Sequence, residues 1–371
     1  MGKIYTAMGL MSGTSLDGVD VSIIQSDGNR EFSSILDRYF EYDKELIHKI
    51  LNIREKITNI ESLNKYLNEI IDLERNITLF HAKIVNQLAL KNDIHLVGFH
   101  GQTIIHSPEN KISKQIGDGK LLCQLVKKDI VYNFRENDIL NGGQGAPLAP
   151  IYHKALMKHL KIVDPRLIVN IGGITNVTYL NRGNIFSTDI GPGNCLIDKW
   201  IKKNFDKDFD EYGKISLEGK INLNIADNFL NKLKKTQKNK NISYDTSDFD
   251  ISEFNQLNPK DSVATLSFIT AKAILNFAKD LDLKRIIICG GGRLNQAILN
   301  NLKKDRFSIS LIDEIKSSQY DSFTPNLNGD FIESQAFAYL AIRSFLKLPI
   351  SFPETTGCKK PCSGGVLVKN Y

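Results

Sequence analysis

The stretch GLMSGTSLDGVDVSII, residues 9–24, interrupts an apolar run with a segment rich in glycine and hydroxyl groups. Alternating apolar positions on both sides predict two strands, and the Gly, Ser and Asp residues between them predict a tight turn. Glycines let a backbone approach a ligand closely or adopt a positive φ, and exposed N–H and hydroxyl groups can hold phosphate oxygens. From this stretch alone, an ordinary hairpin and a phosphate-binding loop both stay open.

A second stretch repeats the pattern. RLIVNIGGITNVTYL, residues 166–180, again gives strand, glycine turn and strand, just after an Asp-Pro pair at 164–165. Further on, KRIIICGGGRLNQAIL, residues 284–299, predicts a strand, a glycine turn and a helix. Strands alternate with helical segments, including a long one at 61–90 and another at 261–281, which predicts the α/β class. Two similar hairpins, one opening each half, indicate a duplicated unit with a cleft between the copies.

Length and composition agree with two globular domains. The chain has 371 residues, of which 42% are hydrophobic and 24% charged. We expect one domain at residues 1–165 together with about 345–371, and a second at 166–344. The formal net charge of +6 is mild, and the lysine-rich run at 232–241 has no interleaved aromatic residues. A solvated loop explains that run better than a nucleic-acid surface.

The cysteines and the N-terminus indicate a reducing compartment. Five scattered cysteines cannot all pair within one chain, and reduced thiols are the simpler account. Cys358 and Cys362 resemble half of a metal site, but no second Cys or His cluster lies near them in the sequence. The first residues lack a signal-peptide pattern, and no run of about 18 apolar residues exists to span a bilayer. We expect a soluble, cytoplasmic protein.

Several common nucleotide motifs are absent. The sequence holds no GxxxxGK[ST] phosphate loop and no kinase HRD or DFG set, and GPGNCL at 191–196 fails the third position of a GxGxxG fingerprint. Two glycine hairpins and a later strand that ends in three glycines are instead similar to the marks of the actin-like ATPase and sugar-kinase superfamily. This resemblance implies a two-domain actin-like ATPase fold, a duplicated ribonuclease H-like architecture, with ATP and sugar in the interdomain cleft.

A closer resemblance covers nearly the whole chain. MSGTSLDGVD, HGQT, GGQGAPLAP, NIGGITNV, DIGPGN, GDFIESQAFAYLA and the closing PETTGCKKP occur in the order found in anhydro-N-acetylmuramic acid kinases. The resemblance implies an enzyme that opens 1,6-anhydro-N-acetylmuramic acid with water and phosphorylates O6 from ATP, giving N-acetylmuramic acid 6-phosphate in cell-wall recycling. The implied partners are the sugar and ATP, without nucleic acid or membrane, and a homodimer stays open.

The resemblance also implies the nucleotide site. The glycine hairpins and the later glycine strand end would contact ATP through Gly13, Thr14, Ser15, Leu16, Asp17, Gly18, Val19, Asp20, Gly172, Gly173, Asn176, Gly290, Gly291 and Gly292. Two positions depart from the wider superfamily, because Met11 and Asn170 stand where acidic residues are usual. Asp17 is then the nearest carboxylate for Mg²⁺, an ion that usually keeps several waters and need not touch the protein much.

Two acidic residues match family positions near the sugar. Asp189, in STDIGPGN, is the expected base for the water that attacks the anomeric carbon. One carboxylate can suffice, because the departing O6 is itself the phosphoryl acceptor. Read without the resemblance, Asp189 would cap the following turn or helix. Glu333 is the expected second catalytic residue, and its local explanation is a favourable charge in the first turn of a helix.

Polar loop residues complete the expected sugar site: His100, Gln102, Arg135, Asp138 and Gln144. An arginine here can face the lactyl carboxylate of the sugar. A hydrogen-bonded turn histidine explains His100 equally well. Alternatives for the whole chain are another sugar or carboxylate phosphotransferase of this fold, or an actin-like assembly protein switched by nucleotide. The distinctive loops HGQT, GGQGAP and DIGPGN favour a substrate pocket.

Overall fold

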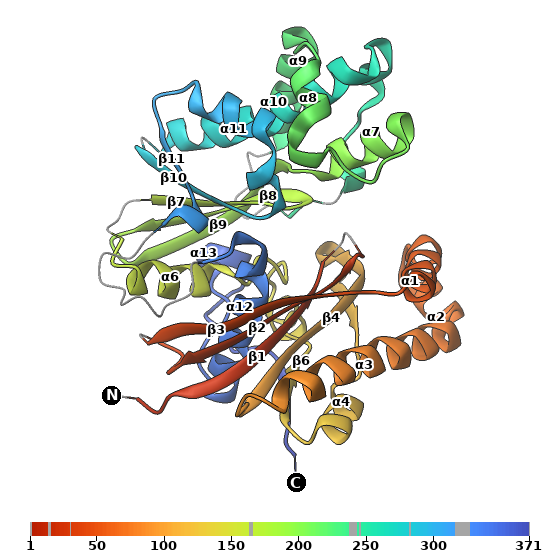
Figure 1. The fold of residues 1–371 in the computed structure, drawn as a ribbon, viewed down its shortest axis with the longest axis vertical. Helices are drawn as coiled ribbons and strands as arrows, with labels where there is room; N and C mark the ends of the chain where they lie inside the picture. Colours follow the sequence, from red (N-terminus) through yellow and green to blue (C-terminus); the bar gives the residue numbers. More distant parts are fainter. Residues whose placement is uncertain are drawn as a thin grey trace. The chain divides into compact units, whose positions relative to one another are not determined.

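The computed structural model describes residues 2–13, 16–29, 31–162, 166–236, 243–244, 246–281, 283–315 and 327–370. The chain divides into two compact units (Figure 1). Among the described residues, unit 1 holds 2–162 and 331–370, and unit 2 holds 166–315 and 327–330. Within the described residues, every helix is too short or too polar to cross a lipid bilayer.

Unit 1 is built on one mixed sheet. Its strands lie in the order β12-β6-β4-β1-β2-β3, and β5 pairs with β4. The first three strands form an antiparallel meander, while β1, β4 and β6 are parallel. The strand bounds are β1 (Tyr5–Ser12), β2 (Gly18–Ser26), β3 (Phe32–Glu41), β4 (Leu96–Ser107), β5 (Ile112–Ile116), β6 (Asp129–Tyr132) and β12 (Val366–Val368).

Helices complete unit 1. Apolar side chains of α1, α3 and α4 join those of β1, β2 and β4 in one core, which includes Leu46, Ile77 and Leu122. The helix bounds are α1 (Lys44–Lys56), α2 (Ile60–Lys65), α3 (Leu67–Ala89), α4 (Gly119–Val126), α5 (Glu136–Leu140), α6 (Pro150–His159), α12 (Ile332–Phe345) and α13 (Pro353–Thr356). The helical stretch predicted at 61–90 is therefore two helices, because Tyr66 leaves the α conformation.

Helix α12 corrects the predicted domain boundary. The second domain was predicted to extend to residue 344, but α12 packs against β1, β2 and β4 of unit 1 (Figure 1). Two glycines permit this close approach. A Cβ on Gly9 would lie 2.0 Å from the Ser334 carbonyl oxygen, and one on Gly98 would lie 2.4 Å from that of Phe337. The helix is buried from Ser334 to Arg343, so it belongs to the core of unit 1.

Unit 2 repeats the strand plan of unit 1. Its order is β11-β10-β7-β8-β9, with β7, β8 and β9 antiparallel and β7, β10 and β11 parallel. The meander β1-β2-β3 with β4 and β6 follows the same order in unit 1. This repetition confirms the α/β, duplicated, actin-like architecture. The bounds are β7 (Arg166–Ile171), β8 (Ile174–Asn181), β9 (Asn184–Pro192), β10 (Arg285–Cys289) and β11 (Ser308–Leu311).

One apolar core joins the helices of unit 2 to its sheet. Val169, Val177 and Ile288 of the sheet pack with residues of the surrounding helices, among them Trp200 and Ile274. The helices are α7 (Cys195–Phe205), α8 (Lys214–Glu218), α9 (Leu223–Thr236), α10 (Pro259–Asp280) and α11 (Gln296–Lys303).

Candidate active site

The first glycine loop joins β1 to β2 in unit 1. Two of its predicted ATP contacts, Thr14 and Ser15, lie outside the described residues. The carbonyl oxygen of Gly13 accepts a hydrogen bond from the Gln102 side chain at 3.0 Å. Leu16 adopts a positive φ of 62°, and its side chain is buried in the core of unit 1. Gly13 is therefore held by a hydrogen bond and Leu16 by its buried side chain, on either side of residues 14 and 15.

The loop leads into β2 through four predicted contacts. Asp17 is exposed, and Asp20 is half-buried. Val19 points into the core, so only its backbone can face a ligand. A Cβ on Gly18 would lie 2.3 Å from the Phe40 carbonyl oxygen. Close pairing with β3 alone therefore explains the glycine at position 18.

The second glycine hairpin joins β7 to β8 in unit 2. The Gly172 carbonyl accepts from the Asn194 N–H at 2.8 Å, and the Gly173 carbonyl accepts from the Gly193 and Cys195 N–H groups at 2.9 and 3.1 Å. Carbonyl and N–H point in opposite directions across a trans peptide. The Gly173 N–H therefore points away from this brace, as a phosphate donor would. Position 172 also has space, because a Cβ there would meet nothing closer than 3.6 Å.

The three glycines after β10 serve different purposes. Gly290 has a φ of 78°, and a Cβ there would lie 2.3 Å from the Asn170 side-chain oxygen. A Cβ on Gly292 would lie 2.2 Å from the Ile171 side chain. Both glycines are required by the fold. Gly291 is different, since a Cβ there would meet nothing closer than 3.9 Å, which leaves room for a ligand.

Asp189 lies in a row of polar residues across the sheet of unit 2. Asn170 is paired with Asn176, which is paired with Asp189 on β9. Directly opposed residues on neighbouring strands share a face of the sheet. The Asp189 carboxylate accepts a hydrogen bond from the Tyr244 N–H at 2.9 Å. Desolvation raises the pKa of Asp189 to about 7, and the Tyr244 hydrogen bond acts in the opposite direction.

The capping explanation for Asp189 does not hold for the next helix. The N-cap of α7 is Asn194, whose own side chain makes no capping hydrogen bond. Asp189 instead lies inside β9, five residues earlier than the cap. A half-buried carboxyl with a raised pKa is a candidate general base.

A second group of predicted site residues gathers in unit 1 around Arg135. Its guanidinium donates to the Gly145 carbonyl at 2.8 Å and to Nε2 of His100 at 2.9 Å. Nδ1 of His100 lies 2.8 Å from the Gly101 carbonyl, which can only accept, so Nδ1 carries the proton. Burial first, and the Arg135 charge second, hold the pKa of His100 well below its usual value. His100 is therefore a neutral acceptor that orients Arg135.

Glu333 belongs to the same group. It lies in the first turn of α12 and is exposed. Desolvation by the surrounding protein nevertheless raises the pKa of its carboxyl, and the charge of Arg135 acts to lower it. Arg135, between β6 and α5, and Glu333 of α12 therefore lie close enough for their charges to interact.

The glycine-rich segment GGQGAP wraps around a carboxylate of the protein itself. The Asp138 carboxylate accepts from the Gly145 N–H at 2.7 Å and from the Thr356 hydroxyl at 2.6 Å. A Cβ on Gly143 would lie 2.2 Å from that carboxylate. The Gln144 N–H donates to the Thr356 carbonyl at 2.8 Å. Asp138 is 1% exposed, so the structure gives it a role in holding the loop, and its direct contact with sugar stays a prediction.

Gln102 also lies below the surface. It is fully buried, and its side-chain amide fastens Gly13 as described above. Its Oε1 has no hydrogen-bond partner among the described residues. Gln144 differs, because it is half-exposed at the loop surface.

Asp138 also belongs to a group of buried side chains with metal-ligating atoms. Its carboxylate and the thiols of Cys358 and Cys362 lie within 4.8 Å of one another. Both thiols donate to the Lys360 carbonyl at 3.2 Å. Burial raises the pKa of Cys358 to about 12, which keeps its thiol protonated. Because Mg²⁺ prefers oxygen ligands, this group is a poor site for the ion expected of a kinase.

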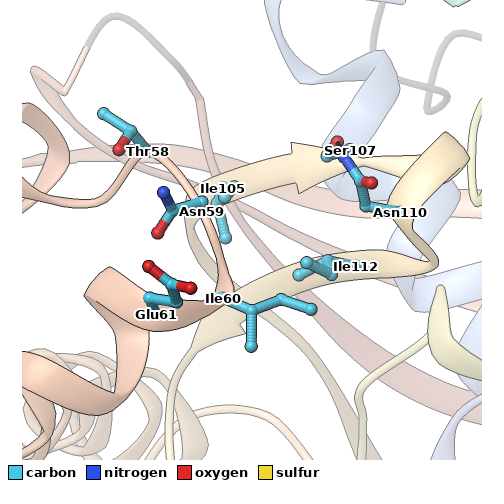
Figure 2. A pocket seen from close by; sticks show the side chains of 8 residues that line it. All are labelled: Thr58, Asn59, Ile60, Glu61, Ile105, Ser107, Asn110 and Ile112. Carbon is cyan, nitrogen blue, oxygen red and sulfur yellow. Dashed lines mark hydrogen bonds between the residues drawn. The ribbon is translucent and has the colours of Figure 1, made fainter.

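Two hollows in unit 1 lie apart from these residues. One, of about 290 Å³, lies between the start of α2 and the β4–β5 hairpin, where Figure 2 shows Ile60, Ile105 and Ile112 among polar side chains. The other, of about 530 Å³, follows β5 and the start of α4. No predicted site residue lines either hollow.

Two residues that contact the predicted site residues have no signal in the sequence. Tyr244 and Thr356 contact Asp189 and Asp138 from 55 and 218 residues away, and the Tyr244 contact is made by backbone. No local pattern signals such contacts. Asn170 was noticed only as a departure from the superfamily, but strand pairing places it in the row of Asp189.

Comparisons with known proteins identify the family of the chain. Residues 5–370 match the family model described as anhydro-N-acetylmuramic acid kinase. The chain is 48% identical to the anhydro-N-acetylmuramic acid kinase of Pelagibacter ubique (strain HTCC1062) and 37% identical to that of Agrobacterium fabrum, over 100% of each chain. A solved ROK family glucokinase from Streptomyces griseus, in complex with glucose and AMPPNP, aligns with a TM-score of 0.44 at 12% identity, covering 91% of this chain and 99% of its own. The family match and the identities show that the chain belongs to the anhydro-N-acetylmuramic acid kinase family.

Proposed function

We propose that this chain opens the anhydro bridge of 1,6-anhydro-N-acetylmuramic acid with water and phosphorylates O6 from ATP. The products are N-acetylmuramic acid 6-phosphate and ADP, and the reaction recycles cell-wall sugar in the cytoplasm. The single observation that carries the proposal is the Asp189 carboxyl, half-buried in a polar row across β7, β8 and β9, with a pKa raised to about 7 by desolvation. Membership of the kinase family supports the use of ATP.

The proposed reaction balances with one base. Asp189 takes a proton from water while the water oxygen forms a bond to C1 of the sugar. The C1–O6 bond breaks, and its electron pair stays on O6. O6 then bonds to the γ-phosphorus, the bond to the β–γ bridging oxygen breaks, and ADP leaves. A carboxyl with a pKa near neutrality suits this task, because it is ionised often enough to act and basic enough to accept the proton.

Arg135 and Glu333 are proposed to hold the sugar. Each terminal nitrogen of Arg135 carries a second N–H besides the one given to Gly145 or His100. Those remaining N–H groups suit the lactyl carboxylate of the sugar. Glu333 is exposed, and it lies close enough to Arg135 for that charge to lower the pKa of its carboxyl. It can accept hydrogen bonds from sugar hydroxyls.

The two glycine hairpins are proposed to hold the ATP phosphates, and Gly291 to face the adenosine. Asp17 fits a Mg²⁺ ion, because it is an exposed hard-oxygen ligand at the end of the first loop. Bound Mg²⁺ would neutralise phosphate charge during transfer.

A product assay tests the proposal. The protein is incubated with ATP, Mg²⁺ and the anhydro sugar, and the product is weighed. The expected mass gain corresponds to one water and one phosphoryl group. A gain of the phosphoryl group alone would show a kinase that leaves the bridge closed, and no gain would remove the proposal.

The role of Asp189 has a sharper test. Asp189→Asn should abolish turnover and leave ATP and sugar binding nearly unchanged, a loss of at least about 10²–10⁴ in rate. In ¹⁸O-water, the label should appear on C1 of the product. Label on phosphate, or full activity of the variant, would end this mechanism.

A further inference from the structure

The side chains of Asp138, Cys358 and Cys362 form a buried cluster in unit 1. The sequence shows only the two thiols, and the fold adds a carboxylate from α5, far earlier in the chain. One ligand atom from each residue lies within 4.8 Å of the other two. Asp138 and Cys358 are each 1% exposed, and Cys362 is 7% exposed. Three metal-ligating side chains therefore face one another away from solvent.

The carbonyl oxygen of Lys360 adds a fourth donor atom. It lies 3.2 Å from the sulfur of Cys358 and 3.2 Å from that of Cys362. A tetrahedral Zn²⁺ ion, with bonds of about 2.3 Å to sulfur and about 2.0–2.2 Å to oxygen, separates its ligand atoms by about 3.4–3.8 Å. The two sulfur–oxygen distances are close to this range. Small rotations of the side chains would bring all four atoms around one ion.

Backbone hydrogen bonds hold the segment that carries both thiols. The Cys362 N–H donates to the Ser351 carbonyl at 3.1 Å, and the Ser351 N–H donates back to the Cys362 carbonyl at 3.2 Å. The Lys359 N–H donates to the carbonyl of Asn141, the residue that ends α5, at 3.0 Å. The ligands are therefore placed before an ion binds, which lowers the entropic cost of binding.

Asp138 is oriented by neighbouring donors. One of its carboxylate oxygens accepts from the Thr356 hydroxyl at 2.6 Å, and the other accepts from the Gly145 N–H at 2.7 Å. Each oxygen keeps a further lone pair for a metal ion. Outer contacts of this kind orient the carboxylates that bind metals in proteins. The cluster thus has both ligands and the groups that position them.

The charge of the cluster fits a divalent ion. With protonated thiols, the cluster carries the single negative charge of the Asp138 carboxylate. When Zn²⁺ binds, the two thiol protons leave to solvent, and the two charges of the ion balance the two thiolates. The net charge stays at minus one, so no further net charge is buried. Thiolate ligands favour zinc, whereas Mg²⁺ takes oxygen ligands.

We infer that unit 1 binds one Zn²⁺ ion through Cys358, Cys362, Asp138 and the carbonyl oxygen of Lys360. Protein atoms take all four positions, as they do in structural zinc sites. The ion joins the segment after α13 to α5, and through Asp138 to the GGQGAP segment. This inference does not depend on the proposed reaction.

Metal analysis and cobalt spectroscopy test the inference on the full chain. Protein purified under reducing conditions from cells supplied with zinc should contain one zinc ion per chain. After a chelator has removed the zinc, added Co²⁺ should give a thiolate-to-cobalt charge-transfer band, and Zn²⁺ should abolish that band. A large excess of Mg²⁺ should leave the band unchanged, because Mg²⁺ prefers oxygen ligands.

Substitution of the thiols assigns the band to this cluster. The double variant Cys358→Ala, Cys362→Ala should lose both the zinc and the band. Cys123→Ala is the matched control, because Cys123 is another buried free thiol of unit 1, and it should keep both. Circular dichroism would show that each variant is folded. A wild-type chain without zinc and without the band, a band that persists in the double variant, or a band that disappears in Cys123→Ala would each overturn the inference.

A substitution that leaves every ligand in place gives a second test. Thr356→Val removes the hydroxyl that orients Asp138, and it should weaken Zn²⁺ binding about 10–100-fold. Thr355→Val, whose hydroxyl bonds only locally, should bind Zn²⁺ like wild type. Equal affinities of the two variants would contradict the role of Asp138 as a ligand. These measurements use neither ATP nor sugar, so failure of the zinc site and failure of the proposed function are distinguishable.

Discussion

Asp189 owes its chemistry to its surroundings, since desolvation in β9 raises the pKa of its carboxyl to about 7. Only the ionised form accepts a proton from water. We therefore expect kcat on the anhydro sugar to rise about tenfold per pH unit below pH 7 and to level off above it. Rates measured from pH 5 to 9 would show this. N-acetylmuramic acid, whose 6-hydroxyl is already free, needs no water attack, so its kcat should not show this rise below pH 7. A flat profile on the anhydro sugar would contradict the role as base.

Asp198 has a similar shift without a catalytic task. Desolvation, and then the charges of Asp210 and Asp208, raise its pKa to about 7. A carboxyl whose pKa is higher in the folded state stabilises the fold at pH below about 4, and this contribution is lost as the pH rises through 7. The free energy of unfolding of Asp198→Asn, measured relative to wild type, should therefore be higher at pH 8 than at pH 4. The expected difference is on the order of 1 to 2 kcal/mol. Urea unfolding at both ends of the range would measure it.

An exposed carboxyl provides the control for that measurement. Asp227 lies on the surface of α9. Asp227→Asn should shift the free energy of unfolding little, and by the same amount at both pH values. If Asp198→Asn behaved like this control, the desolvation of Asp198 would be disproved.

At the scale of elements, some glycines of the turns are required by the fold, and others leave space that a ligand could occupy. A Cβ on Gly172 meets only ordinary contacts, whereas one on Gly193 would lie 2.2 Å from the Gly172 carbonyl oxygen. Gly172→Ala should therefore fold with a thermal midpoint near wild type. If this hairpin holds the ATP phosphates as proposed, the variant should bind ATP at least about tenfold more weakly, because its methyl group would stand where phosphate oxygens approach. Gly193→Ala should lower the midpoint. Calorimetry with ATP and with sugar would check the pair, and unaltered ATP binding in Gly172→Ala would place the phosphates elsewhere.

The same elements show what local sequence could predict. Both glycine hairpins and the strand before Gly290 follow from apolar alternation and turn residues, which are signals within a few positions. No local signal shows which of the two sheets α12 covers, because the apolar pattern of this helix would suit either sheet. Only the distant Gly9 and Gly98, which allow close packing, decide it. The sequence predicts that the GGQGAP loop belongs to a substrate pocket, but its Gly143 makes room for the Asp138 carboxylate.

At the scale of the whole molecule, the duplication could be predicted because the sequence repeats strand, glycine turn and strand. The strand orders of the two sheets confirm it. The site residues could be predicted only through the family resemblance. The contacts that hold these residues could not be predicted, since Tyr244 and Thr356 reach them over long separations along the chain, through a backbone N–H and a single hydroxyl. These contacts arise from how the chain closes on itself.

A substitution of Thr356 would test whether its contacts with Asp138 and Gln144 support the proposed sugar site. Its hydroxyl donates to Asp138 at 2.6 Å, and its carbonyl holds Gln144, so the end of the chain supports the GGQGAP segment. Thr356→Val keeps the volume and leaves a buried carboxylate oxygen without that donor, which should cost about 1.5–3 kcal/mol of unfolding free energy. The KM for sugar should rise, and the ATP affinity should stay near wild type. Thr355→Val is the matched control, because its hydroxyl bonds only locally to Phe352 and should leave the KM for sugar unchanged. Equal effects of the two substitutions on sugar would mean that the C-terminal segment stabilises unit 1 without shaping the site.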